Sequence, residues 1–464
     1  MPIQFQNHRA GNHDLLIPPA AVSGDFVFVG SQTPHDLERG RLVTRIEELD
    51  ADLVAIIPSD MVISDVPEAR IRAQTLMALK NLRLALESAG SSFKRLVALR
   101  MFLRDRRDIP SAVDVVHRAL GADLPSATVI ETNGPNVDPD IDVQIDALAL
   151  SRDSGFELRH FVVPELVPLH RPFPTATFAG PFLFTSTIAG CDPATRRPAT
   201  LLSELTAEER GLADEYYVSA AEEALVAEQL MLWRNHKAIL AAAGIPFENV
   251  LHQNNWLRIS MQQYVPVTRV RRNVFGLDRG RTAATSLPVS NLRTPAAHYE
   301  CSLIAVRPGF EKQGFKKEIG IGSHGVGPYY LGATRAGRYV FAAGEVAIDT
   351  SQSRPRMVER AADLSGGLRH LHFGRNYREI PLVAQSHCVY ELIAEGLANY
   401  GCTFADVAHQ TVYLVDVGDF AALERIAVSH FGGRLPPTTI VPILGASPFR
   451  ENLLEIEVTA VAPR

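Results

Sequence analysis

The same arrangement of residues occurs three times along this chain of 464 residues. A glycine, an aromatic residue and a run of apolar residues occupy 24–30, and the arrangement returns at 180–186 and at 337–343. The copies share a period of about 156 residues, far longer than the roughly 20 to 50 residues of a solenoid repeat. Each copy is long enough to bury a core of its own, so we expect three tandem domains. Their expected bounds are 1–152, 153–310 and 311–464.

Each copy follows the same order of elements. In the first copy, 26–30 alternates like a strand, and we expect a turn near 34–36 and a returning strand at 41–43. The segment 69–89 carries apolar residues close to a 3.6-residue spacing and ends before a glycine, which predicts a helix. A strand, a second helix and two more strands follow, the last at 143–150. The order β-β-α-β-α-β-β predicts an α+β fold with the helices on one face of each sheet.

Composition and charge exclude several classes of protein. The net charge is −6, and no basic stripe with interleaved aromatic residues is present, which argues against a nucleic-acid partner. No run of 18 apolar residues occurs, so a membrane span is not expected. The start of the chain lacks the apolar stretch of a secretory signal, and the four cysteines show no paired spacing. We therefore expect a soluble, cytoplasmic protein with reduced thiols.

Three long segments separate the first strands of each copy from its first helix. They span 47–66, 193–220 and 352–379, and they differ from one another in sequence. Long insertions in compact domains are usually functional or disordered. Their apolar and aromatic content favours ordered flaps, which we expect to cover the binding clefts.

Short motifs in the copies are shared with a known family. An Ala-Gln pair opens the first helix at 73–74, an Ala-Gly pair ends it at 89–90, and Leu-Glu-Ile-Glu fills the closing strand at 454–457. With Gly-Pro-Tyr at 327–329 and Ala-Gly-Glu at 343–345, the third copy resembles the Rid family of reactive-intermediate deaminases most closely. The resemblance implies short chains that form trimers with a ligand cleft between neighbours. Three fused copies then resemble one trimer within a single chain, an intramolecular pseudo-trimer that is monomeric or forms a homodimer and takes a small-molecule substrate.

The resemblance also implies where catalytic carboxylates should lie. The glutamate with which the family's deaminases activate water maps to Glu300 in the second copy and Glu455 in the third. The first copy has Gln144 there, so we interpret that copy as mainly structural. A partly buried carboxyl with a raised pKa suits general acid–base catalysis. An exposed strand glutamate is the competing interpretation.

Further residues of the expected clefts follow from the same comparison. Tyr329 corresponds to the tyrosine at the entry, and Gly344 and Glu345 lie where the family has Gly-Gln. Backbone N–H groups around Gly344 are expected to hold a carboxylate or a developing anion. His298 lies two residues before Glu300, hence on the same strand face, and a structural and a functional role remain equally open for it.

One family feature is missing from all three copies. The resemblance implies an arginine that holds the substrate carboxylate in a Pro-x-Arg-Ser/Thr strand, but 125–128, 282–285 and 436–439 contain none. A guanidinium is the natural clamp for a carboxylate. Arg281 and Arg450 are the expected replacements, and solvated loop arginines are the alternative. Arg279 and Arg293 are further candidates.

No motif points to a cofactor or a metal. The chain has no glycine-rich phosphate loop, no dinucleotide fingerprint and no Ser-His-Asp order. His370 and His372 share a strand face, but no third ligand stands at a supporting spacing, so we expect no metal site.

These features predict an enzyme that adds water to a small imine, enamine or unsaturated amino acid, such as an aminomuconate-type ring-cleavage product. In this hydrolytic deamination, Glu455 or Glu300 orients and deprotonates the water. Two alternatives remain open. One is a small-molecule-binding or regulatory protein without catalysis, which the missing arginine also suits. The other is a chorismate-type hydrolase, because that group shares the fold.

Overall fold

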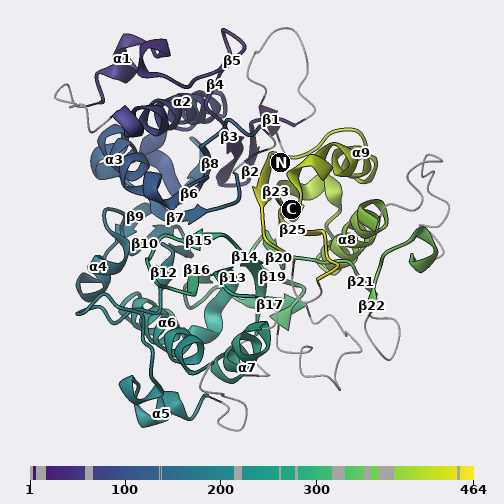
Figure 1. The fold of residues 1–464 in the computed structure, drawn as a ribbon. Helices are drawn as coiled ribbons and strands as arrows, with labels where there is room; N and C mark the ends of the chain where they lie inside the picture. Colours follow the sequence, from purple (N-terminus) through teal and green to yellow (C-terminus); the bar gives the residue numbers. More distant parts are fainter. Residues whose placement is uncertain are drawn as a thin grey trace.

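Three mixed sheets lie around a common centre, each with two long helices on its outer face (Figure 1). The computed structural model describes residues 4–6, 17–57, 66–134, 136, 138–213, 222–260, 263–276, 281–315, 330–349, 356–364, 381–446 and 450–463. The expected α+β fold of three tandem units is confirmed. In the described part of the chain, no helix has the length and apolar character needed to cross a bilayer.

The first unit shows the plan that all three follow. Its closing strand lies in the middle of the sheet, between the opening strand and the strand that follows the first helix. The strand that precedes the closing strand in sequence pairs parallel to the strand after the first helix, on its other side. A short strand from the second unit continues the sheet beyond this parallel pair. The order is β1 (Gln4–Gln6), β2 (Ala20–Ser23), β3 (Phe26–Gln32), β8 (Val143–Leu150), β6 (Leu96–Leu103), β7 (Ser126–Glu131) and β15 (Asn291–Leu292), covered by α2 (Val66–Ser88) and α3 (Ile109–Leu120).

The second unit repeats this plan, and a strand of the third unit pairs with its parallel edge strand. In addition, β12 (Ile188–Ala189) pairs with the closing strand. The order is β18 (Tyr330–Leu331), β14 (Thr282–Pro288), β13 (Val250–Leu257), β16 (Tyr299–Val306), β11 (Phe182–Thr185), β10 (Ala176–Ala179) and β9 (Leu158–Phe161), covered by α6 (Glu223–Ala242) and α7 (Tyr264–Phe275).

The third unit has the same centre and the same parallel edge. The order is β17 (Lys312–Phe315), β19 (Ala333–Ala336), β20 (Tyr339–Ala342), β25 (Leu454–Val461), β23 (Val407–Leu414) and β24 (Thr438–Pro442), covered by α8 (Pro381–Ala398) and α9 (Phe420–His430).

The opening hairpin differs from the prediction. The partner of β3 is β2, which precedes it, whereas 41–42 pairs with 35–36 in a separate small hairpin. The turn between β2 and β3 contains Gly24 at φ +61°, a backbone conformation that glycine adopts without a steric penalty. The expected return strand at 41–43 was therefore wrong, because a two-residue turn before Phe26 closes the hairpin first.

The segments that were expected to form flaps lie partly outside the described residues. Their described parts contain the short helices α1 (Ala51–Val54) and α5 (Ala207–Arg210) and one arm of a two-stranded ribbon, β22 (Arg356–Met357), which pairs with β21 (Ile348–Asp349). Whether they cover a cleft remains a prediction.

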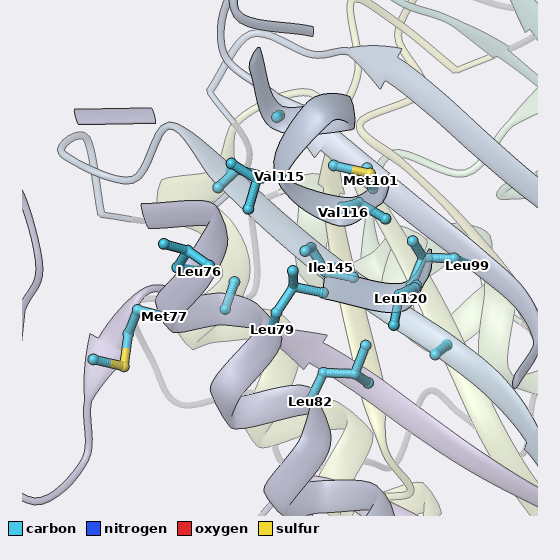
Figure 2. Packing of buried hydrophobic residues seen from close by; sticks show 14 of the residues in the cluster. Leu76, Met77, Leu79, Leu82, Leu99, Met101, Val115, Val116, Leu120 and Ile145 are labelled. Atoms are coloured by element: carbon cyan, nitrogen blue, oxygen red, sulfur yellow. The ribbon is translucent and has the colours of Figure 1, made fainter. Parts of the chain in front are cut away.

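Each unit buries an apolar core between its helices and its sheet. Figure 2 shows this core in the first unit, where Leu76, Leu79 and Leu82 of α2 face the sheet and Val116 of α3 lies beside Met101 of β6. Full burial of such a side chain stabilises the fold by about 1.5–3 kcal/mol.

The opposite faces of the three sheets meet at the centre of the molecule. At one end, Phe26, Phe182 and Tyr339 of the three units pack edge to face, with ring centroids 5.0–6.1 Å apart. At the other end, the Trp256 ring lies 5.7 Å from that of Phe102 and 6.2 Å from that of Tyr413. Each of these rings is buried against rings of the other units, so the two aromatic clusters help to hold the three units together.

A polar belt and a cavity of about 150 Å³ lie between the two aromatic ends. Arg100 donates hydrogen bonds to Asp146 (2.6 Å), to Glu457 (3.3 Å) and to the Thr411 hydroxyl (2.9 Å). The belt therefore connects the first unit to the third through one guanidinium.

Candidate active site between the second and third units

The units meet at three equivalent junctions, where the parallel edge strand of one unit lies against the opening strand of the next. Thr187 N donates to Ala127 O at 2.9 Å between the first and second units, and Gly344 N donates to Ala284 O at 3.3 Å between the second and third. At the junction of the third and first units, Gly30 lies directly against the backbone of Thr438. One residue of a closing strand stands at each junction, and these residues are Gln144, Glu300 and Glu455.

Gln144 forms a fixed amide bridge. Its Nε2 donates to Ile440 O at 2.5 Å, and its Oε1 accepts from Asn136 Nδ2 at 3.2 Å. The side chain is fully buried and has no titratable group. This junction therefore has no acid or base at the position of the expected catalytic residue.

Glu300 is buried at the junction of the first and second units. Its Oε1 accepts from Thr294 N at 2.7 Å. Burial raises the pKa of this carboxyl, and the charge of Glu228 adds to that rise, whereas the Thr294 hydrogen bonds and the charge of Arg293 oppose it. Arg293 is occupied by the carbonyls of His170 and Arg171 and lies over the Phe173 ring.

Glu455 is buried at the junction of the second and third units, with 3% of its surface exposed. Burial raises the pKa of its carboxyl well above the usual value, and the charges of Glu457 and Glu345 act in the same direction. A backbone hydrogen bond from Ser286 and the charge of Arg271 lower it. This carboxyl can therefore hold its proton at pH values where an exposed glutamate is ionised.

Gly344 allows the carboxyl of Glu455 to lie against the backbone of the third unit. A Cβ at position 344 would overlap the Glu455 carboxyl oxygen, so any larger residue would displace this carboxyl from its position. The N–H groups around Gly344 do not point to a ligand, in contrast to the expectation. Gly344 N donates to Ala284 O, and Glu345 N donates to Ile456 O at 2.9 Å, because the backbone here joins two sheets.

A buried cluster of polar side chains borders Glu455 from the second unit. Arg271 of α7 donates to the Ser286 hydroxyl at 2.6 Å and to the Tyr264 hydroxyl at 3.1 Å. Asn255 Nδ2 donates to the same Ser286 hydroxyl at 3.3 Å and to Thr285 O at 3.0 Å. Tyr299 donates to Asn255 Oδ1 and also interacts with Arg271. We call Arg271, Tyr264, Ser286, Asn255 and Tyr299 the Arg271 cluster.

The sequence did not point to the Arg271 cluster. A position-by-position comparison of the three copies would have revealed it, because these positions are polar in the second copy and apolar in the other two. The predicted replacements for the missing arginine lie elsewhere. Arg450 is exposed, and Arg281 is half-buried, with no hydrogen-bond partner for its Nε among the described residues. Tyr329 lies outside the described residues.

His298 belongs to a structural clamp. Its Nδ1 lies 2.9 Å from Glu228 Oε2, and Glu228 Oε1 accepts the backbone N–H groups of His298 and Tyr299 at 2.8 and 3.0 Å. Gln74 and Gln385 accept the matching N–H group in the other units, at 2.7 and 2.8 Å. The Glu228 carboxylate therefore anchors the start of the closing strand, with His298 beside it.

The described residues bring no three His, Cys, Asp or Glu side chains close enough to hold a metal ion. His370 and His372 lie outside the described part of the chain. The expected absence of a metal or cofactor therefore remains a prediction.

Comparison with known proteins finds a family match in two of the three units. A family model described as Endoribonuclease L-PSP matches residues 56–151 and 374–462, in the first and third units. A RutC family protein of Pyrococcus abyssi is 24% identical over 126 residues, which is 27% of this chain and 79% of that protein. The protein DfrA of Myxococcus xanthus is 35% identical over 81 residues, 18% of this chain and 60% of that protein. The expected resemblance to the Rid family is therefore confirmed, with direct family matches in the first and third units.

Solved structures that are similar to this chain match a single unit or most of its length. A Rid family protein from Yersinia pestis covers 32% of this chain and 98% of its own, at 17% identity and a TM-score of 0.25. A chorismatase covers 79% of this chain and 93% of its own, at 13% identity and a TM-score of 0.45.

Proposed function

We propose that this protein is a hydrolase that adds water to a small imine, enamine or unsaturated amino acid and releases ammonia, at the junction of the second and third units. One observation carries the proposal. Glu455 is a buried carboxyl with a raised pKa, it lies against Gly344 and Ser286, and it borders the Arg271 cluster. A buried carboxyl beside a cation from another element is an arrangement that functional sites often use.

The chemistry needs one group that moves protons in both directions. The Glu455 carboxylate takes a proton from water while the water oxygen bonds to the C=N carbon and the nitrogen gains a proton. The tetrahedral intermediate then loses its C–N bond, the nitrogen leaves as ammonia, and a C=O bond remains. Each imine consumes one water and yields one carbonyl compound and one ammonia, so no oxidant or reductant is needed. A carboxyl whose pKa lies near the working pH performs both steps well.

The equivalent position in the first unit supports this assignment. Gln144 cannot take or give a proton, and both ends of its amide are used within the protein. Glu300 retains a carboxyl, but Thr294 binds it, and the residues of the first unit that match Arg271 and Ser286 are valines. The junction of the second and third units is the one that combines a carboxyl with a neighbouring guanidinium at these positions.

The test is ammonia release from an imine made in place. An amino-acid oxidase converts alanine to 2-iminopropanoate, and a β-eliminating enzyme converts serine to 2-aminoacrylate. With either source, we expect the protein to accelerate ammonia release and carbonyl formation in equal amounts, with the Glu455→Gln variant as the control. No acceleration with any imine or enamine, together with tight binding of small molecules, would identify a binding protein instead. Turnover of chorismate without ammonia release would identify the chorismate-type hydrolase.

A further inference from the structure

The elements of the three units align with one another, so each residue of one unit can be compared with its counterparts in the other two. Arg271 on α7 corresponds to Val116 on α3 and to Ala427 on α9. Val116 and Ala427 are fully buried in the apolar cores of their units. Figure 2 shows Val116 beside Met101, and the counterparts of these two residues in the second unit are Arg271 and Asn255.

The partners of Arg271 show the same contrast. At each of their positions, the first and third units have an apolar residue. Tyr264 corresponds to Ile109 and Phe420, Asn255 to Met101 and Val412, Ser286 to Val129 and Ile440, and Tyr299 to Val143 and Leu454. The second unit therefore has five polar groups where its sister units have a continuous apolar core.

Folding does not explain this cluster. A buried polar group costs free energy unless it is hydrogen-bonded, and a buried charge costs more. The first and third units form the same sheet and helices with apolar residues at all five positions, so the fold does not require the polar ones. Departures from an apolar core in an otherwise consistent structure are expected at functional sites.

The position of the Arg271 cluster shows what it could serve. The Ser286 hydroxyl accepts from Arg271, and the Ser286 backbone binds Glu455 of the third unit. Ala284 lies two residues before Ser286, on the same face of β14. It stands where the Rid resemblance implies an arginine. The helix residue Arg271 thus brings a guanidinium to a strand that lost its own.

We propose that Arg271, with the hydroxyl groups of Ser286 and Tyr264, forms the carboxylate-binding subsite of this junction, so that the substrate is a small carboxylic acid whose carboxylate lies against Arg271 while its reacting carbon faces Glu455. This inference rests on the proposed function for the identity of the reacting group. The binding of the carboxylate itself does not depend on turnover. At the other two junctions, valine and alanine stand at the position of Arg271, and valine and isoleucine stand at the position of Ser286. These junctions therefore do not hold an anion in this way.

A binding experiment with matched probes tests the subsite. The probes are 2-oxobutanoate and its primary amide, which have the same shape and differ in the charge of one end. The wild-type protein should bind the acid roughly 10- to 150-fold more tightly than the amide, the range expected for one hydrogen bond to a charged group. Arg271→Met should abolish that preference. Arg271→Lys should restore part of it, because lysine supplies the charge without the planar fork.

Two further variants keep the test informative. Arg72→Met removes a partly buried arginine of the first unit, held by Glu68 and Asp114, and should leave the acid preference intact. If Arg271→Met does not fold, Ser286→Val, which copies Val129 of the first unit, removes the hydroxyl that orients the guanidinium. This variant should weaken binding of the acid and leave that of the amide unchanged.

The outcomes separate the two proposals. Equal binding of acid and amide by the wild type, or an acid preference that survives both Arg271→Met and Ser286→Val, would overturn the carboxylate subsite. An acid preference that depends on Arg271, without ammonia release from any imine, would retain the subsite and refute the deaminase. Ammonia release that is unchanged in Arg271→Met would retain the deaminase and refute the carboxylate subsite.

Discussion

Arg271 of the second unit donates a 2.6 Å hydrogen bond to the hydroxyl of Ser286, whose backbone in turn binds the Glu455 carboxyl of the third unit. One strand residue thus connects a guanidinium and a carboxyl that lie 184 positions apart in the numbering. The charge of Arg271 lowers the pKa of Glu455, whereas burial raises it. The two residues therefore set the protonation of the junction together.

Replacement of Glu455 should remove most of the turnover. Glu455→Gln keeps the shape of the side chain but cannot accept a proton, so turnover should fall roughly 10²- to 10⁴-fold, the usual contribution of a general acid–base group. Steady-state ammonia release at saturating substrate measures this. Gln144→Ala is the matched control and should leave turnover nearly unchanged. If Glu300→Gln lowers turnover as strongly as Glu455→Gln, a second junction also takes part.

The same substitution should stabilise the protein at high pH. Because the folded pKa of Glu455 lies above its unfolded value, the folded state keeps a proton that the unfolded chain loses. This contribution to stability is complete below the unfolded pKa and is lost as the pH rises through the folded pKa. Glu455→Gln cannot ionise, so its Tm should match that of the wild type at pH 4 and exceed it increasingly as the pH rises above the unfolded pKa. A Tm difference that does not grow with pH would contradict the raised pKa.

Loss of Arg100 from the polar belt should lower the free energy of unfolding. Arg100 binds Asp146 of its own unit and Glu457 of the third unit, so Arg100→Met leaves two buried carboxylates without their cation. Breaking a buried pair in this way costs about 3–5 kcal/mol. Denaturant unfolding measures the loss. A double variant that also replaces Asp146 by Asn should recover part of the stability, and a single variant as stable as the wild type would show that solvent enters the belt.

A pair of histidines should make the third unit sensitive to acid. His387 Nδ1 lies 3.0 Å from His430 Nε2. Burial lowers the pKa of each to about 4, and for His387 the charge of His430 adds to the effect. Folded pKa values below the unfolded value of 6.5 mean that stability is complete above pH 6.5 and is lost as the pH falls towards about 4.

The variant His430→Phe tests this pair, because phenylalanine suits the neighbouring rings of Tyr390 and Phe404. The decline of Tm between pH 6.5 and pH 4 should be shallower in the variant than in the wild type. Parallel declines would show that the histidine pair is not responsible.

The arrangement of the units predicts the state of assembly. The three units already meet one another around a shared core, so the chain should not form the homotrimer that the family resemblance implies for single units. Light scattering at micromolar concentration should give the mass of one chain or of two. A mass of three chains would contradict this.

Much of the fold could be predicted from local patterns. The repeated glycine and aromatic run, the helix that contains Gln74 and the closing strand all recur at one period, and local sequence determines such elements. The hairpin of the first unit could not be placed correctly. The pairing of β3 with β2 depends on a two-residue turn at Gly24, and the run at 41–43 alternates equally well in its own small hairpin.

The sequence by itself determined the three copies, their order of elements, and the change from Glu300 and Glu455 to Gln144 at one aligned position. Only the tertiary structure brought Arg271 next to Glu455. The two residues belong to different units, and their contact passes through Ser286 at the edge of a strand. Sequence spacing predicts neighbours on one helix or strand, whereas a helix side chain that crosses to a strand edge and then to the next unit depends on how the three sheets pack together.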